Sequence, residues 1–535
     1  MSISIKLDAY FDTTLLSIKT LYDELSDTIK FQNHPKIALA PAGRIAEEVI
    51  NKLISNGYSC KGIYVYDKNT EKVFPIRTYD YSAVKLHKPD KIFITSSRYA
   101  NAIKMRFLTS GFEEKNIIDI NENLPQLISI AEARDHIFSS ENRENVDFLM
   151  DILHEKDVVI VNCATLFYDV NEKVKIIKEE LKRDVVWIDH TISAKADKNG
   201  TVRANIIDAM NFIKRRNRRD NIVYFSVNPV WHLVMLYLMR MTFPEIKIIL
   251  YKYDWLNLFC PYEHKDILQK FLNLPMDYIE SEYRVFDLIL SGDIVDGLLY
   301  KDGGETFPVL KDYALPKMYF PAFLPKRLYQ NPPGDITESN RMLYLGKLFS
   351  GNDFPAELFG EVFLFEVLDE IAKQGYFIDL LYVDSPVQSV NAYKDYFRGN
   401  HCVRIIEGKP LNDLLPEIAG RYQWGYVVGD FRKGLSVNVQ HVEMALPARL
   451  FTFLALGIPI VISKELKYSA DFIVRNGIGV TIGAEEITNI GAILKAVDYA
   501  KLRKNVLNMR EQLSLESIKG EFIDFIQRIE KGVRR

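Results

Sequence analysis

One stretch, residues 446–463, limits the possible folds more than any other part of this 535-residue chain. Pro447 suits the first turn of a helix, and Gly457 can adopt the left-handed conformation that commonly ends one. Apolar residues recur between them at helical spacing, at Leu450, Phe453 and Leu454. The largely β-branched run at residues 458–462 then predicts a short buried strand. A helix, a glycine and a buried strand in this order predict one αβ step of a parallel sheet.

The same stretch resembles a sequence signature of GT-B glycosyltransferases, in particular the large nucleotide-sugar-dependent family 4. In that family a basic residue of the signature meets the donor diphosphate, and a glutamate binds the nucleotide ribose. Arg449 stands at the basic position here, and Thr452 stands at the glutamate position one helical turn later. The resemblance therefore implies a donor site with both residues, in which a neutral hydroxyl replaces the carboxylate at the ribose.

Two further strand ends resemble the donor half of that family. Residues 342–347 look like its first strand, which ends in a glycine and a cation. The glycine lets the backbone approach a phosphate, and Lys347 supplies a positive charge for it. Residues 403–409 resemble the strand whose loop holds the nucleotide base. The resemblance thus implies that Gly346, Lys347 and Gly408 bind the donor.

The expected donor loop spans residues 431–445 and contains three candidate site residues. Arg432 and Gly434 are implied donor contacts. Family members carry a pair of acids in this loop, and Glu443 lies one position away from the register that Thr452 sets. Glu443 is therefore a candidate for binding a sugar hydroxyl in the reaction, and the alternative is an acid that solvates the start of a helix.

The preceding half should receive the acceptor, as it does in family-4-like enzymes. Apolar runs predict the strands of a doubly wound sheet at residues 158–161, 185–188, 222–225, 246–250 and 288–290. His190 and Asp254 follow two of these strands, and ligands gather outside the carboxyl ends of parallel strands. Both are candidate catalytic residues, with ordinary hydrogen-bonded loop positions as the alternative.

The front of the chain has the order of a nucleotide-binding βαβ unit. A strand at residues 37–40 leads through a turn into a helix, and a second strand ends at Asp67. Only Gly43 remains of the three glycines of the fingerprint, because Pro41 and Ala46 replace the others. We therefore expect a small Rossmann-like domain that does not bind NAD. Residues 131–145 are mostly polar and charged and are the best linker.

These patterns predict the α/β fold class, with two Rossmann-like halves of a GT-B fold preceded by a small Rossmann-like α/β domain. The predicted parts are an N-terminal domain, an acceptor half, a donor half and a C-terminal helix that crosses back, at residues 1–130, 145–328, 338–514 and 515–535.

Composition narrows the class of partner. Lys and Arg total 68 and Asp and Glu total 71, so the net charge of 68 − 71 = −3 gives no reason to expect nucleic acid binding. Four dispersed cysteines argue against a zinc site or a disulfide scaffold and favour the cytoplasm. One dense basic run begins at Lys214 and ends at Arg219; it could hold the protein at the inner face of the membrane, or be a solvated helix end.

The expected function is transfer of a sugar from a nucleotide-sugar to a glycan, a lipid-linked sugar or a protein, in the synthesis of cell-surface polysaccharide or glycoconjugate. No acidic cluster of the D-x-D kind is visible, so we expect neither a metal nor a further cofactor, and Lys347 and Arg449 would meet the charge of the leaving group. Two alternatives stay open: a binding protein that keeps the GT-B shape without catalysis, and a nucleotide-sugar epimerase.

Overall fold

The computed structural model describes most of the chain, in these ranges: 3–5, 22, 25–29, 36–42, 44–67, 70, 75–95, 100–119, 128–139, 141–163, 168–189, 194–197, 200–228, 232–303, 310, 313–330, 340–433 and 437–532. Of the expected front turn, Gly43 lies outside these ranges. Compact packing divides the chain into two units. The first contains Met1–Glu155 and Val186–Arg218, and the second contains Lys156–Val185 and Arg219–Arg535.

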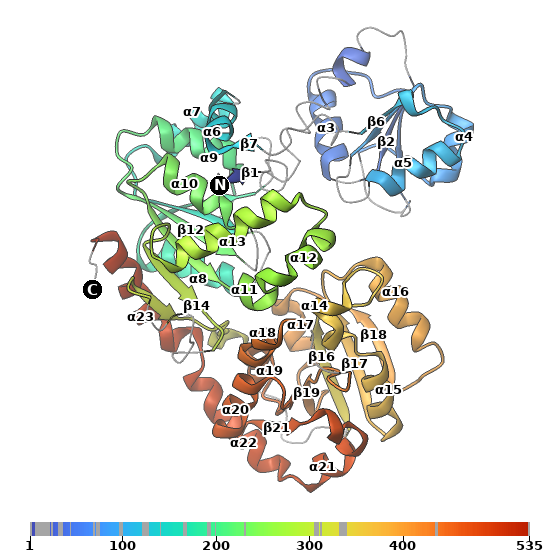
Figure 1. Ribbon diagram of the computed structural model, residues 1–535, viewed down its shortest axis with the longest axis vertical. Coiled ribbons are helices and arrows are strands. Elements are labelled where there is room, and N and C mark those ends of the chain that lie inside the picture. Colours follow the sequence, from blue (N-terminus) through green and yellow to red (C-terminus); the bar gives the residue numbers. More distant parts are fainter. Residues whose placement is uncertain are drawn as a thin grey trace. The chain divides into compact units, whose positions relative to one another are not determined.

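The first unit contains a five-stranded parallel sheet whose faces are both covered. Its strands are β2 (Ile37–Ala40), β3 (Ile63–Tyr66), β4 (Thr78–Tyr79), β5 (Lys91–Ile94) and β6 (Ile117–Asp119), in the order β4-β3-β2-β5-β6. Helix α3 (Arg44–Ser55) contributes Val49, Ile50 and Leu53 to an apolar cluster on one face. Helices α4 (Val84–His87) and α5 (Ala100–Thr109) contribute to a second cluster. Figure 1 shows α3, α4 and α5 around this sheet. Burial on both faces is typical of a parallel sheet and explains the continuous apolar strands of this domain.

The expected linker at residues 131–145 is wrong. Most of these residues lie in helices α6 (Ile130–Ser139) and α7 (Arg143–Leu153), and α6 and α7 both pack against α9 (Ile206–Arg215). The polar residues occupy the exposed faces, whereas Ala133, Ile137, Val146 and Leu149 are buried. Two short amphipathic helices in succession have enough polar residues to resemble a linker, because only about a third of their positions face the core.

An eight-stranded sheet forms the half that is expected to receive the acceptor, which we call the acceptor half. Its order is β10-β11-β9-β8-β12-β13-β14-β15. The strands are β8 (Val158–Cys163), β9 (Asp184–Ile188), β10 (Lys195–Ala196), β11 (Val202–Ala204), β12 (Ile222–Asn228), β13 (Lys247–Lys252), β14 (Gly297–Tyr300) and β15 (Lys317–Tyr319). The neighbouring pairs β8–β12, β12–β13, β13–β14 and β14–β15 are all parallel. The carboxyl ends of β12, β13 and β14 therefore lie along the same edge.

The expected strand at residues 288–290 is wrong, because these residues end a helix. Helix α13 (Met276–Leu290) runs through them, and the next strand is β14. A run of three apolar residues fits the buried face of a helix as well as a strand, so periodicity alone cannot separate the two. Here the longer pattern decides, since Ile279, Phe286 and Ile289 are buried along one helical stripe. The remaining described helices of this half are α8 (Tyr168–Glu180), α10 (Val234–Thr242), α11 (Leu256–Phe259) and α12 (Lys265–Leu272).

A six-stranded parallel sheet forms the half that is expected to bind the donor, which we call the donor half. Its order, β18-β17-β16-β19-β20-β21, is that of the doubly wound dinucleotide-binding fold. The strands are β16 (Arg341–Gly346), β17 (Phe377–Tyr382), β18 (Val403–Glu407), β19 (Trp424–Val427), β20 (Ile460–Ser463) and β21 (Gly479–Ile482). The helices are α14 (Ala356–Phe359), α15 (Phe365–Lys373), α16 (Val387–Tyr396), α17 (Leu411–Ile418), α18 (Val439–Met444), α19 (Arg449–Leu456), α20 (Lys467–Asn476), α21 (Ile490–Ala496) and α22 (Tyr499–Gln512).

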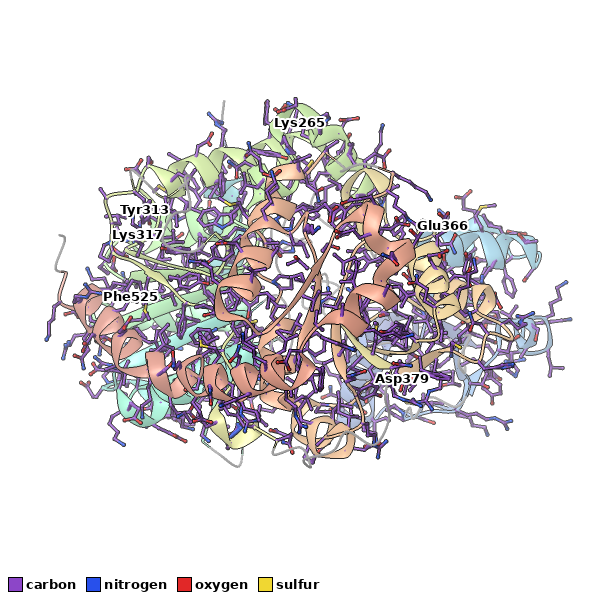
Figure 2. The ribbon with its side chains drawn as sticks, turned by 90° about the horizontal axis from the view of Figure 1, so that it is seen from below. Lys265, Tyr313, Lys317, Glu366, Asp379 and Phe525 are labelled. Atoms are coloured by element: carbon purple, nitrogen blue, oxygen red, sulfur yellow. The ribbon has the colours of Figure 1, made fainter. Side chains whose placement is uncertain are left out.

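The last helix, α23 (Leu515–Glu530), returns to the acceptor half. It packs so closely on β14 that a Cβ atom at Gly297 would lie 3.0 Å from Phe525 Cζ and 2.0 Å from Ile529 Cδ1 (Figure 2). The rings of Phe320 and Phe522 stack at 4.6 Å between centroids. Two α/β halves with parallel or mostly parallel sheets, and a terminal helix that crosses back, give the GT-B arrangement, which confirms the expected fold class.

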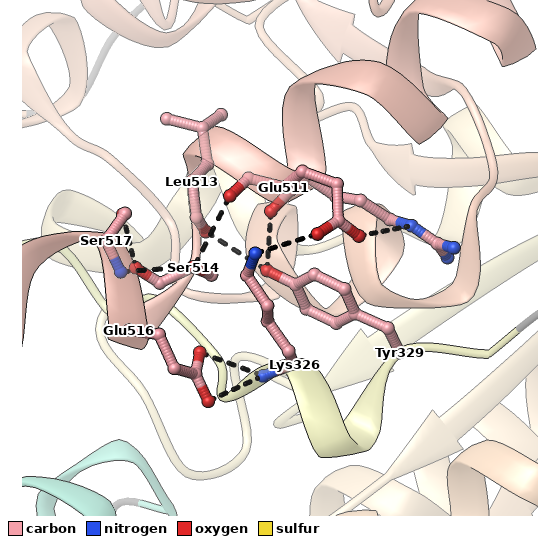
Figure 3. Close-up of polar contacts among 8 residues, drawn as sticks. Lys326, Tyr329, Glu511, Leu513, Ser514, Glu516 and Ser517 are labelled. Atoms are coloured by element: carbon pink, nitrogen blue, oxygen red, sulfur yellow. Dashed lines mark hydrogen bonds and ion pairs between the residues drawn. The ribbon is translucent and has the colours of Figure 1, made fainter.

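Residues 326–329 contact the chain where α22 ends and α23 begins. The backbone N–H of Lys326 donates to both carboxylate oxygens of Glu516, at 3.1 and 3.0 Å, and its ammonium group pairs with Glu511 at 2.8 Å (Figure 3). The hydroxyl of Tyr329 donates to the carbonyl oxygen of Arg510 at 2.7 Å. These contacts hold residues 326–329 against the turn between α22 and α23.

Candidate functional site

Helix α19 and strand β20 confirm the predicted helix, glycine and strand. The helix begins at Arg449, and Gly457 ends it in the left-handed conformation with a φ of +71°. Strand β20 begins at Ile460, two residues later than expected. Every residue from Leu450 to Leu456 is buried, so the position of Arg449 at the first turn is fixed by the packing of the whole helix.

Arg449 lies against the carboxyl end of β16. Its guanidinium carbon is 4.8 Å from the centroid of the Tyr344 ring. A Cβ atom at Gly346 would lie 3.8 Å from Arg449 Nη1. Gly346 has a φ of +138°, a backbone conformation that residues with a side chain rarely adopt. The cation therefore lies beside bare backbone at the edge of the sheet where phosphates bind in doubly wound folds.

Lys347 and Gly408 lie at the same edge. The ammonium group of Lys347 is 3.6 Å from Asp384 Oδ2, with the two side chains 37% and 84% exposed, so their attraction is weak and leaves the ammonium open to another anion. The backbone N–H of Gly408 donates to the Tyr382 carbonyl at 2.7 Å. A Cβ atom at Gly408 would lie 3.0 Å from that oxygen, so this close approach of two backbone segments favours glycine.

Arg432 is engaged within its own loop. Its guanidinium donates to both oxygens of Asp430, at 2.8 and 2.7 Å, and lies 3.7 Å from Glu366. Burial alone would raise the pKa of Asp430, but the hydrogen bonds and charge of Arg432 outweigh it and hold that pKa below its usual value. Glu366, which Figure 2 labels, lies in the first turn of α15. The expected donor contact of Arg432 would compete with this pair.

Four other candidates lie as follows. Glu443 forms an ion pair with Lys467 at 2.6 Å, between α18 and α20. Thr452 is buried, with 6% of its surface exposed. His190 and Gly434 lie outside the described residues. The structure thus brings Gly346, Lys347 and Arg449 together, and it gives Glu443 a partner that is not a ligand.

A cluster of charges lies at the carboxyl ends of β13 and β14. The ammonium group of Lys301 is 2.7 Å from Asp302 Oδ1 and 3.4 Å from Asp254 Oδ1. Lys301 and Asp302 are almost completely buried, whereas the Asp254 side chain is 31% exposed. Lys252 is fully buried at the end of β13. Asp254 is therefore the carboxylate of this cluster that faces solvent.

The pKa values in this cluster follow from burial and charge. Burial would raise the pKa of Asp254, but Lys301 and the other nearby cations outweigh it and lower that pKa. Burial lowers the pKa of Lys252 to about 7. For Asp302 burial prevails over the attraction of Lys301, so its pKa is raised. Asp254 is consequently ionised at neutral pH and is a weak base.

Lys301, Asp302 and His441 were not foreseen from the sequence. Lys301 and Asp302 follow β14, whereas the apolar pattern predicts a strand at residues 288–290, so the pattern does not place residues 301 and 302 at the end of a strand. His441 lies on α18 of the donor half, and its ring meets that of Phe259 edge-on at 5.5 Å between centroids. It also acts electrostatically on Asp254. A hydrophilic Lys-Asp pair directly after a buried strand was the signal that could have been found.

The basic run at residues 214–219 is largely engaged within the protein. Arg215 pairs with Asp147 at 2.8 Å. Arg216 is buried and donates to the carbonyl oxygen of Leu153 at 2.6 Å. The run therefore offers a membrane surface less charge than its sequence suggests.

Neither a metal cluster nor a membrane-spanning helix is found in the described ranges. In that part of the chain, no three side chains among His, Cys, Asp and Glu are placed to hold a metal ion together. Nor does any helix there have the length and apolar character needed to cross a bilayer.

One protein-family model matches part of the chain. Residues 369–523 match the family model described as "Glucosyltransferase 3-like, C-terminal domain". No curated protein sequence matches the chain.

Among solved structures, the chain is similar to the one described as "Trehalose-6-phosphate from E. coli bound with UDP-2-fluoro glucose". The sequence identity is 10% and the TM-score is 0.46, and the match covers 71% of this chain and 100% of the other. It is similar to Alr3699/HepE of Anabaena in complex with UDP and glucose, at 10% identity and a TM-score of 0.46, over 70% and 100%. It is also similar to UGT71G1 of Medicago truncatula complexed with UDP-glucose, at 12% identity and a TM-score of 0.42, over 71% of this chain and 100% of the other.

Proposed function

We propose that this protein is a glycosyltransferase that moves a sugar from a nucleotide-sugar to an acceptor hydroxyl. One observation carries the proposal: Arg449, at the first turn of α19, lies beside the bare backbone of Gly346 at the carboxyl edge of the donor sheet. This is a place for a diphosphate, because a fixed cation and open backbone occur together there. The match of residues 369–523 to a glucosyltransferase-like domain supports it.

The leaving group would be the nucleoside diphosphate. Its charge grows as the bond from the sugar C1 atom to the phosphate oxygen breaks, and Arg449 and Lys347 would stabilise that charge without a metal. Arg449 is suited to this task, since the Tyr344 ring holds its planar guanidinium from one face and leaves its N–H groups to donate. Lys347 is held only weakly by Asp384 and can turn toward the ligand.

The acceptor would bind at the charge cluster of the other half. Asp254 is ionised and partly exposed, so it can accept a hydrogen bond from the acceptor hydroxyl and orient its oxygen toward C1. A new bond from C1 to that oxygen replaces the bond to the diphosphate, and the hydroxyl proton ends on the released diphosphate or in solvent. Because the pKa of Asp254 is lowered, its role is orientation more than proton removal.

The acceptor class is a glycan, a lipid-linked sugar or a protein, in the synthesis of cell-surface polysaccharide or glycoconjugate in the cytoplasm. Four cysteines without disulfide bonds support a reducing compartment. The run from Lys214 to Arg219 would contact the inner face of the membrane peripherally. It would do so through the charges that do not take part in the contacts of Arg215 and Arg216 described above.

The proposal is tested by incubating the purified protein with UDP-, GDP-, dTDP- and CMP-sugars and following release of the nucleotide by mass spectrometry, with and without added acceptors. We expect one donor to be consumed, and Asp254→Asn to slow transfer at least tenfold with a much smaller change in donor binding, since an amide replaces the acceptor-side charge and keeps an oxygen for Lys301. Absence of both consumption and binding for all four donor classes would contradict the proposal.

A second candidate is a binding protein that retains the donor without transferring its sugar. Burial of Thr452, at the position where relatives carry a ribose-binding glutamate, favours it, because α19 then offers the ribose no carboxylate. Stoichiometric binding of an intact nucleotide-sugar, with no consumption in the presence of acceptors, would decide for this candidate.

A further inference from the structure

Two hydrogen bonds join the acceptor half to the segment that leads into α19. The backbone N–H of Leu446 donates to Asp302 Oδ1 at 2.9 Å, and the backbone N–H of Gly303 donates to the Met444 carbonyl oxygen at 3.0 Å. Asp302 and Gly303 follow β14 of the acceptor half, and Leu446 lies three residues before Arg449. The segment at residues 444–446 is thus held from outside its own half.

The carboxylate that holds this segment is deeply buried and incompletely satisfied. The Asp302 side chain is 3% exposed, and its Oδ1 atom also accepts from Lys301 at 2.7 Å. Its Oδ2 atom is buried and has no hydrogen-bond partner among the described residues. Burial of a charge is costly unless it is paired, so the contacts of Oδ1 with the Lys301 ammonium and the Leu446 amide hold the carboxylate in place.

The same contacts form a continuous path between the two sides of the site. Asp254 contacts Lys301, Lys301 contacts Asp302, and Asp302 contacts the Leu446 amide. Three residues on, Arg449 begins α19 and lies beside Gly346. A charge-assisted hydrogen bond from an amide to a carboxylate is stronger than a neutral one, so Asp302 holds the Leu446 amide more firmly than an uncharged acceptor would.

We propose that Asp302 is a positioning residue that sets the place of Arg449 and thereby couples the acceptor half to donor binding. The inference rests on the proposed function, since the donor is taken to bind at Arg449. Asp302 acts through the backbone at Leu446 and not by touching the donor. Affinity for a nucleoside diphosphate then depends on a carboxylate of the opposite half.

Ser469 provides a matched control. Its hydroxyl donates to the Ala445 carbonyl oxygen at 2.5 Å, so it holds the same segment, and it is fully buried. Ser469 belongs to α20 of the donor half, however, and carries no charge. If the coupling comes from the buried charge of the acceptor half, loss of the Ser469 contact should matter much less.

The test compares Asp302→Ala, Asp302→Asn and Ser469→Ala with the unaltered full chain. Hydrogen exchange measured by mass spectrometry reports the peptide at residues 444–456, and calorimetric titration with UDP, GDP and dTDP reports binding. In Asp302→Ala we expect exchange in this peptide to rise at least tenfold, while other peptides of the donor half keep their rates, and nucleotide affinity to fall about tenfold, since a charge-assisted contact is lost. Asp302→Asn keeps an oxygen for the Leu446 amide and should recover most of both.

The following outcomes would overturn the inference or limit it. Unchanged exchange and unchanged affinity in folded Asp302→Ala would overturn the inference, as would faster exchange without any loss of affinity, or an equal loss in Ser469→Ala. If Asp302→Ala does not fold, Asp302→Asn must still show a partial loss confined to residues 444–456, and no loss overturns the inference. If the unaltered protein binds none of the three nucleotides, the proposed function fails and the coupling to donor binding falls with it, whereas faster exchange would still establish that Asp302 holds the segment.

Discussion

Gly346 lies in the proposed donor site and has a backbone conformation that favours glycine. Its φ of +138° is open to glycine, and a Cβ atom placed there would have its nearest neighbours in the side chains of Arg449 and Tyr344, at 3.8 Å. A methyl group there would meet no hard clash. It would strain the backbone and fill the space next to the guanidinium, so stability and ligand binding can be separated at this position.

We expect Gly346→Ala to lower the free energy of unfolding by about 1–2 kcal/mol through strain and to weaken binding of a nucleoside diphosphate more than tenfold. Gly375→Ala is the matched control, because Gly375 also has a positive φ, +87°, in the donor half, with no atom of the described residues within 4 Å of a Cβ position. It should show the strain in a denaturant titration and retain its affinity. Equal affinities in both variants would contradict the placement of the diphosphate.

Asp208 predicts a dependence of stability on pH. It is 1% exposed and accepts hydrogen bonds from Asn145 and Asn205, at 2.6 and 2.5 Å. Burial prevails over these bonds and raises its pKa from the ordinary 3.8 to about 6. The folded state therefore binds the proton more tightly than the unfolded state, and this group's stabilisation is present below pH 3.8 and is lost as pH rises through about 6.

Asp208→Asn removes this loss. The variant should gain unfolding free energy relative to the unaltered protein between about pH 4 and about pH 7.5, by at most roughly 3 kcal/mol, which is the equivalent of the difference in pKa. Denaturant titrations at the two pH values measure it, and the exposed Asp151→Asn serves as control. A difference that does not change with pH would show that Asp208 does not titrate in this range.

At the scale of helices and strands, the sequence predicted what depends on local pattern. The helix and glycine before β20 were found because propensity, a cap and burial agree there. Residues 288–290 were misread because a short apolar run fits two structures, and Lys301 and Asp302 were missed with the strand that precedes them. The pairing of Arg432 with Asp430 could not be foreseen, since it depends on the conformation of a loop.

Asp379 links three strands at the amino edge of the donor sheet. It lies on β17 and is 1% exposed, and it accepts from Arg341 on β16, from Arg404 on β18 and from Tyr422, at 3.2, 2.7 and 2.7 Å (Figure 2). Burial would raise its pKa, but the hydrogen bonds from Arg404 and Tyr422 outweigh it and lower that pKa. The network therefore stabilises the sheet that carries Gly346.

We expect Asp379→Ala to lower the free energy of unfolding by about 2–4 kcal/mol, because it leaves two arginines and a buried hydroxyl without their shared acceptor. Asp395→Ala is the control: it breaks an exposed pair with Arg398 on the same half and should change stability by less than about 0.5 kcal/mol. Denaturant titration measures both. Similar small effects in the two variants would mean that the Asp379 network does not stabilise the sheet.

At the scale of the molecule, the front five-stranded sheet is a separable part. Strand β1 (Ser4–Ile5) pairs with β7 (Ile128–Ser129) in antiparallel register, with Ile5 opposite Ile128. The chain between them thus leaves and re-enters the structure at neighbouring points. A sheet with its own two apolar clusters, connected through adjacent ends, can be removed without cutting another core.

Replacement of residues 6–127 by a linker of about four glycine and serine residues should leave a folded protein with unchanged affinity for nucleoside diphosphates. Deletion of residues 1–130 is the comparison; it also removes both strands of the β1–β7 pair, so it should have the lower melting temperature. Loss of nucleotide binding in the folded linker variant would assign the front domain a part in the donor site.

The central claim is that Arg449 meets the diphosphate of a nucleotide-sugar, and calorimetric titration of Arg449→Ala tests it most directly. The control is Arg475→Ala, which removes an exposed arginine of α20 that pairs with Asp471. We expect Arg449→Ala to remain folded and to lose about 1.5 kcal/mol or more of binding free energy for the nucleoside diphosphate, the contribution of one charge-assisted contact, while Arg475→Ala binds as the unaltered protein does. The same affinity in all three proteins would contradict the claim.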